Sequence, residues 1–485
     1  MTADTEVVTD TRFLGHPRAL GTLFGLEMWE RFSFYGMQGI MTIYLYYAAA
    51  DGGLGLPEGT ATSIIGAYGG LVYLSTIPGA WLADRVAGSE RVLFGSAVLI
   101  MLGHISLALL PGFAGVGVGL CCVALGSGGL KANATALVGA LYRRDDDRRD
   151  AGFSLFYLGI NLGAFIGPLL TGLAQQRLGF HYGFGLAAIG MAAGLVQYVF
   201  GRRNLSPTSN DVPNPLPPGR RLLVVGGVVV VVAVVVVLVL AGVVTAANLS
   251  NVTVGVIAVA AVVYFAVILT SRRTDTAERS RVTSFIPLFL ASFVFFALYQ
   301  QQFTVVILYT DQRLDRTIFG WDMPVPWVNS INPVFIILLA GAFAALWTRL
   351  GPRQPSSPLK FALGTTIMGL AFLAFLPWSG GSGNTTPLLA LVGILLLFTI
   401  AELLLSPVGL SLATKLAPEA FRTQMVSLNF LSIALGTALA GTLAKHYDPD
   451  DEVPYFLTIG GIAIVFGVLL AVATPAIRTL MRGVR

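Results

Sequence analysis

Long apolar stretches alternate with short polar segments along the entire chain. Most of the apolar stretches reach about 20 residues, the length with which an α-helix crosses the hydrocarbon core of a bilayer. Outer-membrane barrels instead show segments of about ten alternating residues, which this sequence lacks. The pattern predicts fourteen membrane-spanning helices, at about 21–49, 60–83, 92–111, 114–141, 152–174, 182–200, 222–244, 252–270, 282–310, 327–348, 360–378, 387–413, 423–444 and 454–476.

Two longer polar linkers divide these helices into groups. Residues 202–221 and 271–281 are polar, and they flank two plain apolar helices, one of which is largely valine. We therefore predict an N-terminal six-helix bundle over 1–201, a linker with two extra helices over 202–281, and a C-terminal six-helix bundle over 282–485. Two six-helix halves are typical of transporters with a binding site where the halves meet.

Composition supports the membrane interpretation. Of the 485 residues, 55% are hydrophobic and only 11% are charged, whereas soluble domains carry about 25% charge. This excludes a soluble enzyme. Twenty-four of the 30 lysines and arginines lie in one set of alternate loops and in the termini, and four lie in the other loops. Basic residues stay on the cytoplasmic side, so we predict a multi-pass protein of the cytoplasmic (inner) membrane with both termini in the cytoplasm.

The remaining compositional signals point to no other partner. The net charge of +5 comes from short loops rather than from a basic face, so we expect no nucleic acid. Cys121 and Cys122 are adjacent in an apolar run and offer neither a disulfide framework nor metal-ligand spacing. The glycine-rich segment before Lys131 lacks the ending of a phosphate-binding loop. We expect no metal and no cofactor.

A few ionisable residues fall inside the predicted helices. A charge at the bilayer centre costs at least about 2.5–3.5 kcal/mol, so such residues mark functional sites. Glu27, Glu30 and Arg31 share one face of the first helix, because they are three and four residues apart. Two carboxylates cannot both be compensated by one guanidinium, so we expect one of them to take up a proton. Lys131 and Glu402 lie on other helices, which suggests a polar cavity.

Purely structural alternatives remain open for these charges. The first-helix group could be a buried ion pair that only fixes helix packing. Glu402 could pair with Lys131 and brace the bundle.

The segment that joins the second and third helices has a distinctive spacing. It resembles the cytoplasmic loop signature of the major facilitator superfamily, in which glycines permit a tight turn and close helix approach. The signature residues, which we expect to serve conformational change, are Gly79, Asp84, Arg85, Gly88 and Arg91.

Three longer motifs resemble the proton-dependent oligopeptide transporter family, and the two extra central helices are similar to those of its bacterial members. Residues 27–36, EMWERFSFYG, are similar to the first-helix motif ExxERFxYYG of that family. Residues 150–163 and 402–418 resemble its signatures on the fifth and tenth family helices. The resemblance covers nearly the whole chain.

This resemblance implies the major facilitator fold and proton-coupled import of di- and tripeptides by alternating access, driven by the proton gradient. It also implies a role for each matching residue. Arg31 and Lys131 would bind the peptide carboxylate and Glu402 the peptide ammonium, while Glu27 and Glu30, with Arg31, would carry the proton. Asn161 and Asn332 would hydrogen-bond the peptide backbone, and Tyr35 and Tyr68 would line the site.

The chain departs from the family pattern at four positions that could line the substrate. Phe34 replaces a tyrosine, Gln38 a frequent arginine, Gln300 a frequent acid and Asn429 a frequent tryptophan. Gln300 cannot titrate, so any salt bridge between its helix and Arg31 or Lys131 is lost. These changes affect coupling and side-chain preference.

Other functions fit less well. Transport of another peptide-like or zwitterionic solute, proton-coupled or facilitative, is the nearest alternative. A membrane-embedded enzyme would need a nucleophile–base pair or a metal cluster in the helices, and a receptor would need long soluble segments. The oligomeric state is not encoded in these patterns, and we expect a monomer.

Overall fold

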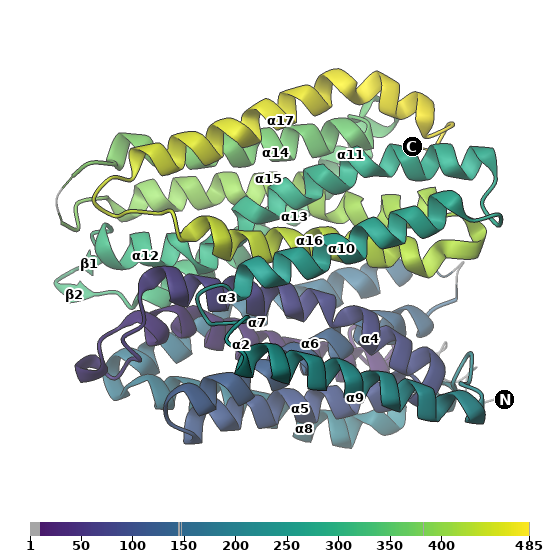
Figure 1. Cartoon of the computed structure of the whole chain (residues 1–485), viewed down its shortest axis with the longest axis horizontal. Coiled ribbons are helices and arrows are strands. Elements are labelled where there is room, and N and C mark those ends of the chain that lie inside the picture. Colours follow the sequence, from purple (N-terminus) through teal and green to yellow (C-terminus); the bar gives the residue numbers. More distant parts are fainter. Residues whose placement is uncertain (1–9, 144–145, 147, 382, 485) are drawn as a thin grey trace. The chain divides into compact units, whose positions relative to one another are not determined.

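The structure of the protein is a computed structural model that describes residues 10–143, 146, 148–381 and 383–484. The described chain is almost entirely helical (Figure 1). Its long helices follow the predicted order, with helices interrupted within the second and the ninth predicted stretches. The prediction of an all-α bundle built from fourteen apolar stretches is confirmed.

The first eight stretches form the helices α2 to α10. Their bounds are α2 Arg18–Tyr46, α3 Glu58–Leu74, α4 Thr76–Leu82, α5 Ser89–Leu109, α6 Gly112–Ala140, α7 Arg149–Leu178, α8 Phe180–Gly201, α9 Pro218–Leu240 and α10 Leu249–Thr270. Helix α5 packs against α6 and α8, and α4 packs against α6.

The last six stretches form α11 to α17. Their bounds are α11 Thr276–Tyr299, α12 Val305–Gln312, α13 Ile331–Leu350, α14 Ser357–Leu373, α15 Leu388–Leu416, α16 Arg422–Ala444 and α17 Val453–Leu480. Helix α14 packs against α15 and α17, and α11 packs against α16. A short antiparallel hairpin of β1 Thr317–Ile318 and β2 Trp321–Asp322 lies between α12 and α13. The sequence did not predict it.

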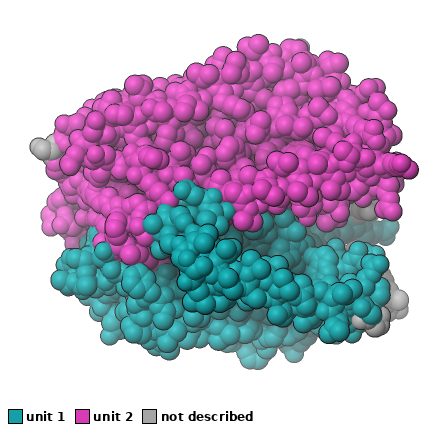
Figure 2. Space-filling model, viewed as in Figure 1, with its two compact units in different colours: residues 1–40, 47–55, 71–252 teal, residues 41–46, 56–70, 253–485 magenta. Residues whose placement is uncertain are grey.

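The chain forms two compact units (Figure 2). Unit 1 comprises residues 1–40, 47–55 and 71–252, and unit 2 comprises 41–46, 56–70 and 253–485. The last residues of α2 and most of α3 therefore belong to unit 2, although they precede most of unit 1 in the sequence.

Twelve of the described helical segments are long and apolar enough to cross a membrane. Helix α2 is not among them because Glu27, Glu30 and Arg31 lower its mean hydropathy, and α3 because it has only 17 residues. Helix α3 ends at Leu74 for a local reason. Pro78 has no amide hydrogen and its ring crowds the carbonyl of the residue four positions earlier, so a continuous helix is disfavoured there.

One close helix contact positions the charged face of α2. Gly163 on α7 lies so near α2 that a Cβ there would stand 2.9 Å from the Phe32 nitrogen and 3.0 Å from the Arg31 Cβ, and would also collide with the Met28 carbonyl oxygen. Only glycine allows this approach. The contact holds the turn of α2 that carries Arg31 directly against α7.

Candidate functional site

The three charged residues of α2 form a buried ion-pair network in unit 1. The Arg31 Nε atom lies 2.9 Å from Glu27 Oε1 and 2.9 Å from Glu30 Oε2. All three side chains are almost completely buried, with exposed fractions of 2%, 3% and 0% for Arg31, Glu27 and Glu30. Isolated buried charges are unstable, so each of these groups depends on the others.

The network still has polar atoms without a hydrogen-bond partner. Within the described part of the chain, Glu27 Oε2 and Arg31 Nη2 are buried and bonded to nothing. A buried acceptor and a buried donor that lack partners are costly. The α2 cluster is therefore well suited to gain a proton, a water or part of a ligand.

Helix α6 completes this cluster from a second side. The Ser127 hydroxyl donates a 2.9 Å hydrogen bond to Glu30 Oε1. One turn later, the Lys131 ammonium stands 4.3 Å from the centre of the Tyr73 ring, a cation–π contact. Its positive charge acts electrostatically on Glu30. The structure thus places Lys131 in the same charged region of unit 1 as Glu30 and Arg31.

The other predicted residues of unit 1 lie on α2 itself, after Arg31, or on α7. The Arg31 guanidinium lies 5.6 Å from the centre of the Phe34 ring, which contacts Tyr35 edge to face. Gln38 is buried, and its Oε1 has no hydrogen-bond partner in the described residues. On α7, Asn161 donates a 2.9 Å hydrogen bond to the Tyr157 carbonyl, which leaves its own carbonyl oxygen available for another donor.

Glu402 forms the centre of a separate cluster in unit 2. Its Oε2 atom accepts a 2.9 Å hydrogen bond from the Tyr299 hydroxyl and a 3.1 Å bond from Asn332 Nδ2. Asn332 also donates to Thr399 Oγ1 at 3.0 Å. Helices α11, α13 and α15 therefore hold one oxygen of the carboxylate in a fixed position. Basic residues take no part in the contacts described for Glu402.

The remaining predicted residues of unit 2 do not join this cluster through any described hydrogen bond. Tyr68 is buried in α3. Gln300 is buried at the end of α11, where a 3₁₀ turn over Gln300–Phe303 interrupts the helix. Asn429 lies on α16 beside Gly409 of α15, with its Oδ1 3.0 Å from the point where a Cβ of that glycine would stand.

The predicted cytoplasmic loop has the expected turn and a close helix contact. Gly88 adopts a φ of 81°, and a Cβ at Gly79 would lie 2.5 Å from the Gly129 Cα. The carbonyls of Asp84 and Arg85 accept 2.9 Å hydrogen bonds from the amides of Asn214 and Leu216. The 202–221 linker therefore lies against this loop. Arg91 is the fifth residue of the signature, and it lies in the first turn of α5.

Sequence reasoning missed several residues that hold these sites. Glu90 accepts hydrogen bonds from Arg202 at 2.8 Å and from Tyr198 at 3.1 Å, and so connects the loop region to α8. Ser127 and Thr399 were also missed. Their spacing offered a signal, because Ser127 stands four residues before Lys131 and Thr399 three before Glu402, on the same helix faces.

Comparison with known proteins gives the family. The model of the POT family matches residues 90–457. This chain belongs to the POT family. The di-/tripeptide transporter of Lactococcus lactis subsp. lactis is 39% identical over 495 residues, covering 98% of this chain and 99% of that protein. A peptide transporter POT solved in complex with sulfate is 44% identical, with a TM-score of 0.94 and 99% of both chains covered. A POT family transporter solved in complex with 5-aminolevulinic acid is 37% identical, with a TM-score of 0.91, covering 97% of this chain and 99% of that one.

These matches confirm the predicted family and the predicted fold class. The POT transporter chain is a multi-pass protein of the cell membrane, and its relatives are transporters rather than enzymes. The likeness runs over nearly the full length, so it includes both of the clusters described above.

Proposed function

We propose that the protein is a proton-coupled symporter that imports di- and tripeptides by alternating access. One observation supports this most directly. The two clusters carry opposite binding chemistry, with the buried Arg31 and the half-buried Lys131 as cations in unit 1 and the half-buried Glu402 as a carboxylate in unit 2. A zwitterionic peptide needs a cation for its carboxylate and an anion for its ammonium. The names of the similar transporters agree with this substrate class.

Each cluster has a distinct role in this proposal. Arg31 and Lys131 bind the peptide carboxylate, and Glu402 binds the ammonium through the oxygen that Tyr299 and Asn332 leave uncovered. Asn161 and Asn332 bind the peptide backbone. The aromatic residues Tyr35 and Tyr68 line the site, together with the four residues at which the chain departs from its family, Phe34, Gln38, Gln300 and Asn429.

Proton coupling is assigned to α2. Glu27 and Glu30 share the single Arg31 guanidinium at equal distances of 2.9 Å. When a peptide carboxylate competes for Arg31, one of the two acids loses its counter-charge and takes up a proton in order to remain buried. Binding of substrate and proton are thereby linked.

The orientation in this proposal follows the basic residues. Both termini lie in the cytoplasm of the cell, and the loop with Gly79, Asp84, Arg85, Gly88 and Arg91 lies on the same side. The protein acts as a monomer without a metal or cofactor.

Uptake into proteoliposomes tests the function. The purified protein should accumulate labelled dialanine against its gradient when the outside is made acidic, and an uncoupler should abolish the accumulation. Unlabelled tripeptides should compete, whereas free alanine and tetra-alanine should compete weakly. Accumulation that ignores the proton gradient would contradict the symport part, and absence of dipeptide binding would contradict the substrate class.

A second candidate is uptake of another small zwitterion. One similar POT family transporter was solved with 5-aminolevulinic acid, which carries an ammonium and a carboxylate but no peptide bond. Competition between dialanine and 5-aminolevulinic acid distinguishes the two candidates, because a peptide transporter should prefer the ligand whose backbone can bind Asn161 and Asn332.

A further inference from the structure

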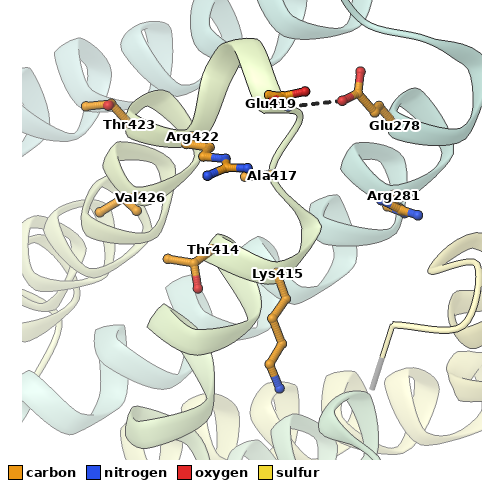
Figure 3. A pocket seen from close by; sticks show the side chains of 9 residues that line it. All are labelled: Glu278, Arg281, Thr414, Lys415, Ala417, Glu419, Arg422, Thr423 and Val426. Atoms are coloured by element: carbon orange, nitrogen blue, oxygen red, sulfur yellow. Dashed lines mark hydrogen bonds between the residues drawn. The ribbon is translucent and has the colours of Figure 1, made fainter. Parts of the chain in front are cut away.

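A pocket lies in unit 2, and none of the residues of the Glu402 cluster lines it. It is about 710 Å³ in volume. The first turns of α11, the end of α15, the α15–α16 connection and the start of α16 form its walls (Figure 3). Its charged lining residues are Glu278, Arg281, Lys415, Glu419 and Arg422. Basic loop residues are common on the cytoplasmic side, but their convergence from three helices on one cavity needs a further explanation.

Of the two carboxylates that line the pocket, Glu278 and Glu419, that of Glu278 already accepts hydrogen bonds from backbone amides. Glu278 Oε1 accepts a 3.0 Å hydrogen bond from the Glu419 amide, drawn in Figure 3, and Glu278 Oε2 accepts a 3.0 Å bond from the Asp275 amide. Its carboxylate therefore fixes the α15–α16 connection to the beginning of α11. A side chain held in this way shapes the pocket wall rather than pairing with the arginines.

Two arginines of the pocket, Arg281 and Arg422, have unused binding capacity. Arg281 Nε is buried and has no hydrogen-bond partner in the described part of the chain. Neither Arg281 nor Arg422 takes part in any ion pair described there. Arg422 and Ala417 both line this pocket (Figure 3).

The backbone adds to this positive potential. Helix α16 has 23 residues, begins at Arg422, and has no side-chain cap on its first amides. The amino end of a helix carries a partial positive charge that favours anions. Lys415 stands in the last turn of α15, where it also offsets the negative end of that helix. Three cations and a helix amino end thus face two carboxylates, one of them held by backbone amides.

We propose that this pocket binds a phosphate-bearing anion, either the headgroup of an anionic phospholipid or a soluble phosphate compound. Guanidinium groups bind phosphate oxygens in a bidentate manner, and basic pockets at the cytoplasmic ends of membrane helices bind lipid headgroups. The proposal goes beyond peptide transport and does not depend on which solute the protein carries.

Binding measurements on the purified full chain in a neutral detergent test this site. The probes are dioctanoyl phosphatidylglycerol and inorganic pyrophosphate. Dioctanoyl phosphatidylcholine and sodium chloride at equal ionic strength serve as the reference ligands. The test variants are Arg422→Gln and Arg281→Gln. The matched control is Arg349→Gln, which removes an exposed arginine at the end of α13, outside the pocket.

We expect each test variant to weaken binding of at least one phosphate probe about tenfold, since hydrogen bonds to charged groups contribute at least this much. The control should bind as the unmodified chain does. Binding of phosphatidylglycerol alone assigns a lipid headgroup, and binding of pyrophosphate assigns a soluble phosphate compound.

Two results would overturn the proposal. One is that neither phosphate probe binds better than the reference ligands. The other is that Arg349→Gln weakens binding as much as Arg422→Gln. Arg422 is exposed, so its variant should fold even if Arg281→Gln does not. Failure of peptide uptake would leave this outcome unchanged, so the two proposals fail separately.

Discussion

The Tyr46 hydroxyl donates a 2.5 Å hydrogen bond to the Asp311 carboxylate. Tyr46 ends α2 and Asp311 lies near the end of α12, 265 positions apart in the sequence. Gln312, the residue after Asp311, donates a 2.6 Å hydrogen bond to Glu58 at the start of α3. All four residues belong to unit 2, so the two bonds hold the end of α2 and the start of α3 against α12 within that unit.

A double-mutant cycle tests the energetic value of this bond. Tyr46→Phe and Asp311→Asn should each lower the free energy of unfolding, and the double variant should lose less than the sum. We expect a coupling energy of about 1–2 kcal/mol. A hydrogen bond to a charged group is stronger than a neutral one, but this bond is only partly buried, and water weakens it. Denaturant titration in micelles measures it. Tyr182→Phe, which alters an exposed tyrosine in unit 1, should be additive with Asp311→Asn.

Glu402→Gln should weaken binding of a free dipeptide about 10- to 150-fold, the range for losing a charged hydrogen bond. The same variant should affect an amino-acetylated dipeptide far less, because that ligand has no ammonium. A competition assay with both peptides measures the difference. Asp450→Asn, on an exposed loop, is the matched control. Equal losses for both peptides in a folded variant would indicate that Glu402 only braces the bundle.

Glu30→Gln should abolish proton-driven accumulation and retain peptide counterflow, because the amide keeps the shape of the side chain but cannot titrate. Glu27→Gln should show the same separation if the two acids work as a pair. Uptake with and without a pH gradient measures it. Unchanged accumulation in both variants would refute the assignment of coupling to α2.

Ser127→Ala leaves Glu30 Oε1 without its 2.9 Å donor. The pH profile of uptake should therefore shift relative to the unmodified protein, although no ionisable group is removed. Ser106→Ala is the control, because Ser106 bonds only the backbone of its own helix in the described contacts. An identical shift in both variants would argue against a role of Ser127 at Glu30.

Gly163→Ala should destabilise the protein by about 1–3 kcal/mol, the cost of overpacking a close contact. The added methyl group would collide with the Met28 carbonyl and displace α2. Gly117→Ala on α6 should have little effect, because nothing lies within 4 Å of a Cβ there. Thermal unfolding compares the two. Similar melting temperatures for the Gly163→Ala and Gly117→Ala variants would mean that α7 can move away from α2 without loss of stability.

Cysteine labelling tests the orientation. In a background with Cys121 and Cys122 replaced by alanine, a membrane-impermeant thiol reagent should reach Phe319→Cys in intact cells. Asp146→Cys should react only after the membrane is opened. Phe319 is fully exposed in the hairpin between α12 and α13. Labelling of Asp146→Cys from outside would reverse the predicted topology.

The sequence was most informative about the positions and lengths of the helices, because the bilayer constrains both. The predicted stretch 423–444 differs by one residue from α16 Arg422–Ala444, because a membrane helix must satisfy its own backbone over a fixed length. Arg31 and its two acids were found because charges are rare in such helices. The interruption of α3 was missed although Pro78 was visible, and a proline in a membrane helix is often tolerated.

Contacts between distant segments could not be predicted. Tyr299 and Glu402 are 103 positions apart, and nothing in either motif specifies that they bond. The turn at Gln300–Phe303 also depends on a distant residue. Within it, Gln301 accepts a 2.8 Å hydrogen bond from Tyr455 on α17. Such helix breaks depend on packing partners, which a single sequence does not reveal.

Helix α9, in contrast to the helices discussed above, buries almost none of its side chains against the rest of the protein. None of the residues in its most apolar window is buried, and most of them are valine. The rest of the protein therefore places almost no demand on the identity of its side chains, and only the surrounding lipid selects them. Its residues can be exchanged among valine, leucine and isoleucine with little consequence, and this segment should diverge faster than any other helix while keeping its length.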